Sequence, residues 1–358
     1  MMRPIFIMLI LFVIAMLATL AVYFPFLEIA KRKNIVDAPS SERKQQKMPV
    51  PVIGGVTVFF GVIIGLCFFK TTVSYVNLIP TIGAMTLMLY IGTIDDILDI
   101  KASIKFLLEI IVSLLLIYGT RNLVRNFQGL AGIETMSVIP AIVFSVLVIV
   151  TIINSINLMD GVDGLSSGFC IYANSCFALF FFLIHDYTYA AIAIISVGAT
   201  IPFFIHNLLG KDTKMYFGDG GTLMMGVLLA SMCLNISSGK EFNYEPMDLS
   251  RFSVLSFCMA VLALPCFDAV RVMFERIIRG KSPFSPDRLH FHHILLDCGL
   301  TPIKTTLLEL FLGVIPLAAF VIACLLSVPI WAQMLIVFAV SLLIVVLPSF
   351  LLRLRKGL

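Results

Sequence analysis

The chain has 358 residues, of which 60% are hydrophobic and only 13% are charged. Soluble globular domains carry charge on about a quarter of their residues, so this composition excludes a soluble globule and indicates a protein that crosses a membrane several times. The formal net charge of +4 is small, and no nucleic-acid partner is needed to explain it.

Apolar runs that could cross the hydrocarbon core, which takes about 20 helical residues, recur along the whole chain. In chain order the predicted spans are 5–27, 51–69, 77–94, 102–118, 137–154, 167–184, 188–206, 220–236, 252–269, 306–326 and 329–352. The first run is too long for a signal-peptide core and no A-x-A-like site follows it, so we expect it to be retained. The sequence therefore predicts an all-α polytopic bundle of about 11 transmembrane helices, forming one domain over residues 1–358.

Lys and Arg are distributed unevenly over the segments between these spans. If the N-terminus lies outside, 19 of the 25 Lys and Arg residues fall in cytoplasmic segments. Because short loops rich in Lys and Arg stay on the cytoplasmic side, we expect an N-out, C-in topology in the cell (inner) membrane.

Aspartates gather at the ends of the predicted spans. They are Asp95, Asp96 and Asp99 after the third span, Asp160 and Asp163 after the fifth, Asp219 at the start of the eighth, Asp268 at the end of the ninth, and Asp287 beyond it. In the topology drawn from Lys and Arg, all of them lie on the cytoplasmic side. One such residue could be a helix end meeting water, but a cluster of like charges indicates a shared site neutralised by a cation or by basic side chains.

A hard divalent cation suits this site. Mg²⁺ usually binds through one or two carboxylates plus substrate phosphates, so most of the aspartates should position other groups rather than ligate metal. The stretch GDGGT, residues 218–222, leads directly into an apolar helix, whose N-terminus favours negative charge. The predicted cofactor is Mg²⁺, with Mn²⁺ as an alternative.

Two basic segments lie on the same predicted side. Residues 42–55, ERKQQKMPVPVIGG, include Lys47. Residues 279–296, RGKSPFSPDRLHFHHILL, hold Arg288 and three of the chain's five histidines, which are His290, His292 and His293. A zinc site is one interpretation of the histidines, but no cysteine lies among them and their neighbours are basic, so contact with phosphate is favoured.

Several separated stretches match a known family in order and on the same side. They are ERKQQKMPVPVIGG, DDILD, NLMDGVDGL, FGDGG and SPFSPDRLHFHH. The chain resembles the polyprenyl-phosphate N-acetylhexosamine-1-phosphate transferases, which are related to the phospho-MurNAc-pentapeptide transferase. The resemblance implies a bundle of ten or eleven transmembrane helices with a cytoplasmic active site. It also implies transfer of a sugar 1-phosphate from a UDP-sugar to undecaprenyl phosphate, with release of UMP and a requirement for Mg²⁺.

The resemblance assigns roles to residues of this sequence. The implied metal ligand is Asp219, and the implied catalytic residues are Asp95, Asp96, His290, His292 and His293. The expected substrate-binding residues are Lys47, Asn157, Asp160, Asp163 and the loop cation Arg288. Asp95 and Asp96 would face the lipid phosphate and the metal, and which of them acts as a base, if either does, stays open.

Other details bear on specificity. SPFSPDRLHFHH resembles the N-acetylhexosamine branch, whereas the three adjacent histidines typical of the muramyl-pentapeptide branch are absent. The link NLLGKDTKMYFGDG is longer than in many relatives and leaves the role of Asn207 open. UDP-GlcNAc is the expected donor, and UDP-FucNAc or a bacillosamine-type UDP-sugar are the alternatives.

Two other functions are weaker alternatives. A secondary transporter would place its acids near the membrane midplane between internal repeats, and no repeat is evident. A CDP-alcohol phosphotransferase would have Ala-Arg after its first Asp-Gly, and DGVDGLSSG has no arginine. The expected partners are a UDP-N-acetylhexosamine, undecaprenyl phosphate and membrane lipids, and a homodimer is one assembly left open.

Overall fold

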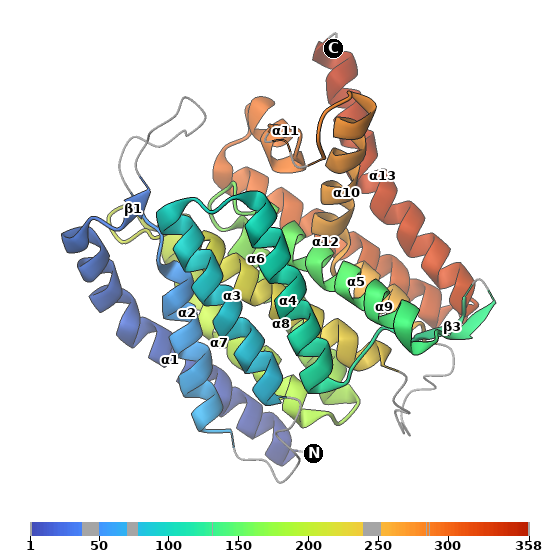
Figure 1. Cartoon of the computed structure of the whole chain (residues 1–358), viewed down its shortest axis with the longest axis horizontal. Helices are drawn as coiled ribbons and strands as arrows, with labels where there is room; N and C mark the ends of the chain where they lie inside the picture. The colour runs from blue at the N-terminus through green and yellow to red at the C-terminus, as the bar shows by residue number, and fades with distance from the viewer. Residues whose placement is uncertain are drawn as a thin grey trace. The chain divides into compact units, whose positions relative to one another are not determined.

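A computed structural model describes residues 2–37, 50–69, 78–130, 132–238, 252–283, 285 and 287–356 (Figure 1). Nearly all described elements are helices, apart from two short antiparallel strand pairs. The contacts divide the chain into two compact units, residues 1–121 with 166–232 and residues 122–165 with 233–358. We call them unit 1 and unit 2.

Unit 1 is built mainly from long apolar helices. Its elements are α1 (Met2–Lys33), β1 (Val36–Asp37), β2 (Val50–Pro51), α2 (Gly54–Cys67), α3 (Leu78–Leu98), α4 (Ala102–Thr120), nearly all of α6 (Leu165–Leu183), α7 (Tyr187–Leu209) and α8 (Gly218–Ser237) as far as Met232. Helices α1, α2 and α7 pack against one another, and α3 packs against α4. A methyl group on Gly61 would lie 1.9 Å from Thr19 Oγ1, and one on Gly198 would lie 2.3 Å from the carbonyl oxygen of Phe12. Small residues therefore let these helices approach closely, as is common between helices in membranes.

Unit 2 contains the remaining elements. They are β3 (Asn126–Leu130), β4 (Ile133–Thr135), α5 (Val138–Leu158), the end of α8, α9 (Val254–Val261), α10 (Ala263–Ile278), α11 (Phe291–Asp297), α12 (Pro302–Leu325) and α13 (Ile330–Lys356). Helix α10 packs against α5, α12 and α13, and the short α11 packs against α12 and α13. A buried apolar cluster that includes Leu264, Phe291 and Leu295 fixes α11 to this group of helices.

The expectation of an all-α polytopic membrane protein is confirmed. Among the described residues, eight helices are long and apolar enough to cross a membrane, or nine if α9 and α10 together count as one span. The predicted span 51–69 is the shorter α2, with 14 residues. The predicted span 252–269 is a bent pair rather than one straight helix, because α9 and α10 meet at 76°. Pro265 lies in the first turn of α10, where its missing N–H disturbs no helical hydrogen bond, so the chain can restart a helix there. The predicted count of about 11 spans is therefore not confirmed.

Candidate functional site

In unit 1, the backbone of the segment VPVIGG, residues 50–55, fixes the position of the start of α8. The Tyr216 N–H donates to the Pro51 carbonyl at 2.7 Å, and the N–H groups of Gly54 and Gly55 donate to the carbonyls of Tyr216 and Phe217 at 3.0 Å each. A methyl group on Gly55 would lie 2.3 Å from the backbone nitrogen of Gly221. Only glycine allows this approach, so the motif sets where Gly218 and Asp219 lie.

The longer link between α7 and α8 is held by side chains on two helices. The Asn207 side-chain amide donates to the Met215 carbonyl at 2.7 Å, which gives this asparagine a structural role. Tyr23 of α1 donates to the Thr213 carbonyl at 2.8 Å, and its ring stacks on His206 with centroids 4.8 Å apart. The extra residues of the link therefore form an anchored segment that leads into Asp219.

Asp96 is bound to the N-terminus of α8. Its carboxylate accepts the backbone N–H of Asp219 at 3.0 Å and that of Gly220 at 3.3 Å. These groups are among the N–H donors that a helix leaves unpaired at its start, and a carboxylate is favoured there. A methyl group on Gly92 would lie 2.4 Å from the backbone of Asp219, so a glycine on α3 makes this approach possible. Asp96 is thus committed to positioning Asp219.

Lys105 on α4 neutralises the other two carboxylates. Its ammonium lies 2.9 Å from Asp95 Oδ2 and also forms an ion pair with Asp219 Oδ2. The other oxygen of Asp95 accepts the Ile100 N–H at 2.7 Å. The structure therefore brings the predicted residues Asp95, Asp96 and Asp219 together. Lys105 was not among the predicted site residues, although the expectation of a neutralising cation and its position ten residues after Asp95 could have identified it.

The geometry of this acidic cluster fits one divalent cation. Among the described residues, no three His, Cys, Asp or Glu side chains are arranged to hold a metal ion. Two carboxylates, those of Asp95 and Asp219, do converge on one positive charge, the ammonium of Lys105. Because Mg²⁺ at phosphate sites commonly takes one or two carboxylates and completes its shell with water and phosphate oxygens, this pair of carboxylates suits it.

In unit 2, the DGVDG turn that follows α5 packs against the histidine-bearing helix α11. A methyl group on Gly161 would lie 2.6 Å from His292 Nε2, so glycine is required for this contact. The hydroxyl of Thr306 on α12 donates to the Asp163 carbonyl at 2.7 Å, and the Asp160 N–H donates to the Asn157 carbonyl at 3.1 Å. The structure therefore brings the predicted nucleotide residues close to the predicted loop histidines.

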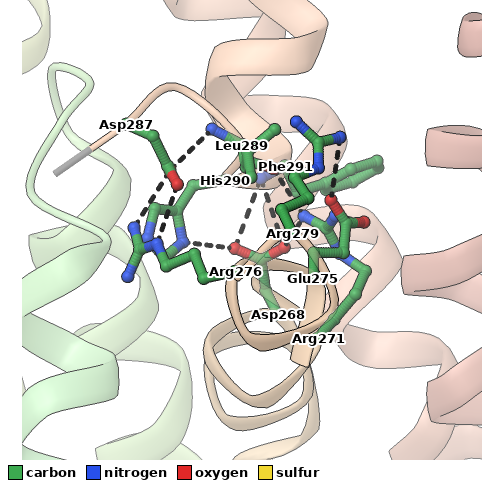
Figure 2. A network of polar contacts seen from close by, with 9 residues as sticks. All are labelled: Asp268, Arg271, Glu275, Arg276, Arg279, Asp287, Leu289, His290 and Phe291. Carbon is green, nitrogen blue, oxygen red and sulfur yellow. Dashed lines mark hydrogen bonds and ion pairs between the residues drawn. The ribbon is translucent and has the colours of Figure 1, made fainter. Parts of the chain in front are cut away.

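His290 is held by a buried carboxylate. Its Nδ1 lies 2.9 Å from Asp268 Oδ2, while Asp268 Oδ1 accepts from Arg271 at 2.7 Å (Figure 2). The Phe291 N–H also donates to this carboxylate, at 3.2 Å from Oδ1. Arg271 in turn donates to the Leu289 carbonyl at 2.7 Å and to Glu275 at 2.8 Å. Asp268 therefore orders the residues that start α11, a role that sequence patterns alone do not reveal.

Arg276 anchors the loop before α11 in a second way. Its guanidinium makes two hydrogen bonds to the Asp287 carboxylate, at 2.7 and 2.9 Å (Figure 2). It also donates to the Pro283 carbonyl at 2.6 Å. Burial alone would raise the pKa of Asp287, but the hydrogen bonds from Arg276 and the Leu289 N–H, together with the charge of Arg276, lower it overall. Asp287 is thus paired with Arg276 and stabilises the loop.

The three histidines differ in their surroundings. His290 and His292 are 5% and 3% exposed, whereas His293 is partly exposed. Burial, with a smaller effect from His293, lowers the pKa of His292 to about 3. Burial and the nearby Arg288 lower the pKa of His293 to about 4. Both rings are neutral near pH 7, so they can offer one N–H to a phosphate but no positive charge.

The remaining predicted substrate-binding residues are the basic residues Arg288 and Lys47. Arg288 is exposed enough to meet a ligand, with 38% of its side chain accessible, and pairs with Asp297 at 2.9 Å. Lys47 lies outside the described residues. The cations that the structure places deepest in unit 2 are Arg271 and Arg276, which bind protein acids.

Comparison with known proteins gives a consistent relationship. Residues 78–237 match the family described as Glycosyl transferase family 4. The chain is 30% identical over 296 residues to the undecaprenyl-phosphate alpha-N-acetylglucosaminyl 1-phosphate transferase of Pasteurella multocida (strain Pm70), which covers 80% of this chain and 78% of that protein. It is 25% identical over 281 residues to the protein of the same name in Escherichia coli (strain K12), covering 76% and 72% of the two chains.

The family match spans the helices that carry Asp95, Asp96 and Asp219, and also the DGVDG turn. The similarity to the Pasteurella protein extends beyond it over most of both chains. The resemblance seen in the sequence is thereby confirmed, and the chain belongs to glycosyl transferase family 4.

Proposed function

We propose that this protein transfers N-acetylglucosamine 1-phosphate from UDP-GlcNAc to undecaprenyl phosphate. An oxygen of the lipid phosphate attacks the sugar-bearing phosphorus of the donor, the bond from that phosphorus to the UMP oxygen breaks, and UMP leaves. The products are undecaprenyl-diphosphate N-acetylglucosamine and UMP. The observation that carries the proposal is the convergence of Asp95, Asp219 and Lys105 in a chain whose relatives are named for this reaction.

The cluster in unit 1 suits the phosphate chemistry. Phosphoryl transfer asks a protein mainly to position two anions and to stabilise the charge that spreads over the transferred group. Asp95 and Asp219 are the residues that would hold Mg²⁺, which when bound neutralises charge on the phosphates. Asp96 would keep Asp219 in place through the helix N-terminus. Lys105 would turn from the carboxylates to a phosphate oxygen once the metal charge is present.

The elements in unit 2 suit the nucleotide and the sugar. Asn157 lies in the last turn of α5, and Asp160 and Asp163 lie on the glycine-rich turn that follows it. These three residues would bind the base and the ribose. The neutral rings of His292 and His293 can donate hydrogen bonds without repelling a cation. Arg288 is the exposed cation of this loop that can meet a phosphate. Lys47 is proposed for the diphosphate on sequence resemblance alone.

The sugar and the location are further parts of the proposal. UDP-GlcNAc is favoured because the relatives that match most of the chain are named for N-acetylglucosamine. UDP-FucNAc and bacillosamine-type donors are the alternatives within the same chemistry. The bias in Lys and Arg supports an N-out, C-in protein of the inner membrane with a cytoplasmic active site.

The deciding experiment is an assay of UMP release by the purified protein in detergent. It uses undecaprenyl phosphate, Mg²⁺ and a panel of UDP-sugars, with matched reactions that lack the lipid. We expect UMP only when lipid and UDP-GlcNAc are both present. UMP release with a different UDP-amino sugar, and not with UDP-GlcNAc, would support the proposed reaction and assign it a different donor. Phosphatidyl transfer from CDP-diacylglycerol, or solute uptake without UMP release, would replace the proposal by one of its rivals.

A further inference from the structure

A small cavity with both apolar and polar walls lies in unit 2, next to the helix that carries the histidines. Its volume is about 10 Å³, and its polar walls are Ser155 of α5, Asp268 of α10, His290 and His292 at α11, and Glu309 of α12. A volume on the order of 10–15 Å³ is the minimum that holds one water molecule, which also needs two to four polar partners. The cavity meets both conditions.

His290 lines this cavity, and one of its ring nitrogens, Nε2, has no hydrogen-bond partner among the described residues. Because Asp268 is paired with Arg271, its carboxylate is ionised and accepts, so His290 Nδ1 must carry the donated proton. In the neutral ring, Nε2 is then an acceptor. This atom is buried, and no other described protein atom forms a hydrogen bond with it. An unpaired buried acceptor is costly, so a donor is expected in the cavity.

Glu309 is the group that can supply the donor. Its side chain is 2% exposed, and its Oε1 is buried without a hydrogen-bond partner among the described residues. An ionised carboxylate without a cation is very costly in such surroundings, whereas a protonated carboxyl needs only an acceptor. His290, whose Nε2 is the unpaired acceptor, lines the same cavity.

We propose that Glu309 is a positioning residue that stays protonated and donates a hydrogen bond to one water molecule in the cavity, and that this water donates a hydrogen bond to His290 Nε2. Both ring nitrogens of His290 then make hydrogen bonds, Nδ1 to Asp268 and Nε2 to the water molecule bound by Glu309. His290 occupies the N-cap position of α11, so hydrogen bonds at both ring nitrogens would fix the start of the helix that carries His292 and His293. The link to catalysis rests on the proposed function, in which α11 contributes to the UDP-sugar site.

Two substitutions at one position test the inference. Glu309→Gln keeps the size and an N–H donor but cannot ionise, and Glu309→Met keeps the size and removes the donor. Leu312→Met, one turn further along α12, is the matched control, because it changes a side chain of the same apolar core without a polar group. Hydrogen–deuterium exchange of the backbone amides of residues 291–298 reports on α11 without any substrate. The KM for UDP-GlcNAc in the UMP-release assay reports on its function.

We expect Glu309→Gln and Leu312→Met to exchange as the wild type does. Glu309→Met should exchange roughly 10-fold faster in α11 and raise the KM by a similar factor, because a buried acceptor is left unpaired. Wild-type exchange in Glu309→Met would overturn the proposal, and so would equal damage in both Glu309 variants, which would mean that the ionised form is needed. If Glu309→Met does not fold, the Gln variant decides by the same criterion. The expected exchange pattern in a protein without UMP release would leave this inference standing and refute the proposed function.

Discussion

Replacing Lys105 by Met should make the protein bind a divalent cation more tightly while turnover falls. In the structure, the Lys105 ammonium lies between the carboxylates of Asp95 and Asp219, where Mg²⁺ is proposed to bind. The ammonium therefore competes with the metal for the same oxygens. Methionine has a similar length and no charge, so Lys105→Met removes the competitor and leaves both carboxylates in place.

The magnitude follows from the exposure of the three groups. A unit charge about 4 Å from a divalent cation repels it by about 8 kcal/mol at an effective dielectric constant of 20 and by about 2 kcal/mol in water. The side chains of Lys105 and Asp95 are 14% and 12% exposed, and that of Asp219 is 30% exposed, which places the cluster between these limits. Because the flexible lysine side chain can move away from a bound metal, the lower limit of about 2 kcal/mol applies, which corresponds to roughly 30-fold tighter binding.

Mn²⁺ titration followed by electron paramagnetic resonance measures this affinity directly, without substrate. Lys101→Met is the control, since Lys101 is an exposed cation at the N-cap of the same helix. Turnover should fall in Lys105→Met alone, because the proposed contact of this lysine with a phosphate oxygen is lost. Unchanged or weaker Mn²⁺ binding in Lys105→Met, or equal tightening in Lys101→Met, would refute a metal site between these two carboxylates.

Four further outcomes are expected. Asp219→Asn should abolish UMP release while circular dichroism shows a folded protein, because a near-isosteric change removes the metal-binding charge; Mg²⁺-dependent activity like the wild type would contradict this. Asp163→Ala should mainly raise the KM for the UDP-sugar, by up to roughly 100-fold, whereas Asp95→Asn should mainly lower kcat. The reverse pattern in steady-state kinetics would show that the roles assigned to Asp163 in UDP-sugar binding and to Asp95 in turnover are exchanged. The folded protein keeps His292 neutral down to about pH 3, whereas the unfolded residue takes up a proton near pH 6.5, so the stability from this ring is complete above pH 6.5 and is lost as the pH falls. His292→Gln should therefore flatten the decline of Tm between these pH values, and an unchanged slope would count against the assignment. Cys298, retained as the only cysteine, should react with impermeant thiol reagents only from the cytoplasmic side, and its labelling in intact cells would overturn the orientation.

The membrane class and most helix positions could be predicted because they depend on local properties. A run of about 20 apolar residues must form a helix in lipid, whatever the rest of the chain does. Exceptions arise where tertiary packing decides, as in the short α2 and in the bend between α9 and α10. Periodicity and hydropathy do not register such a bend, because both halves are apolar and helical.

The acidic residues of the candidate site could be named from the sequence, but their separate tasks could not. Asp95 and Asp96 are adjacent and chemically identical, yet Asp95 binds Lys105 whereas Asp96 binds the backbone at the start of α8. The difference arises because neighbouring residues on a helix point in directions about 100° apart. Asp268 and Asp287 belong to the same set of aspartates, and each pairs with an arginine to order the loop before α11.

The sequence by itself determined the class of protein, the residue types at the site and the family. Hydrophobicity and short motifs are read along the chain, and neither depends on how distant segments meet. Only the tertiary structure decided which charges are neighbours. Lys105 and Asp219 are separated by 114 positions, and the Asp268–His290 pair by 22. Glycines at 55 and 92 let the start of α8 approach α2 and α3, and Gly161 lets its turn approach the ring of His292. That geometry exists only after the helices have packed.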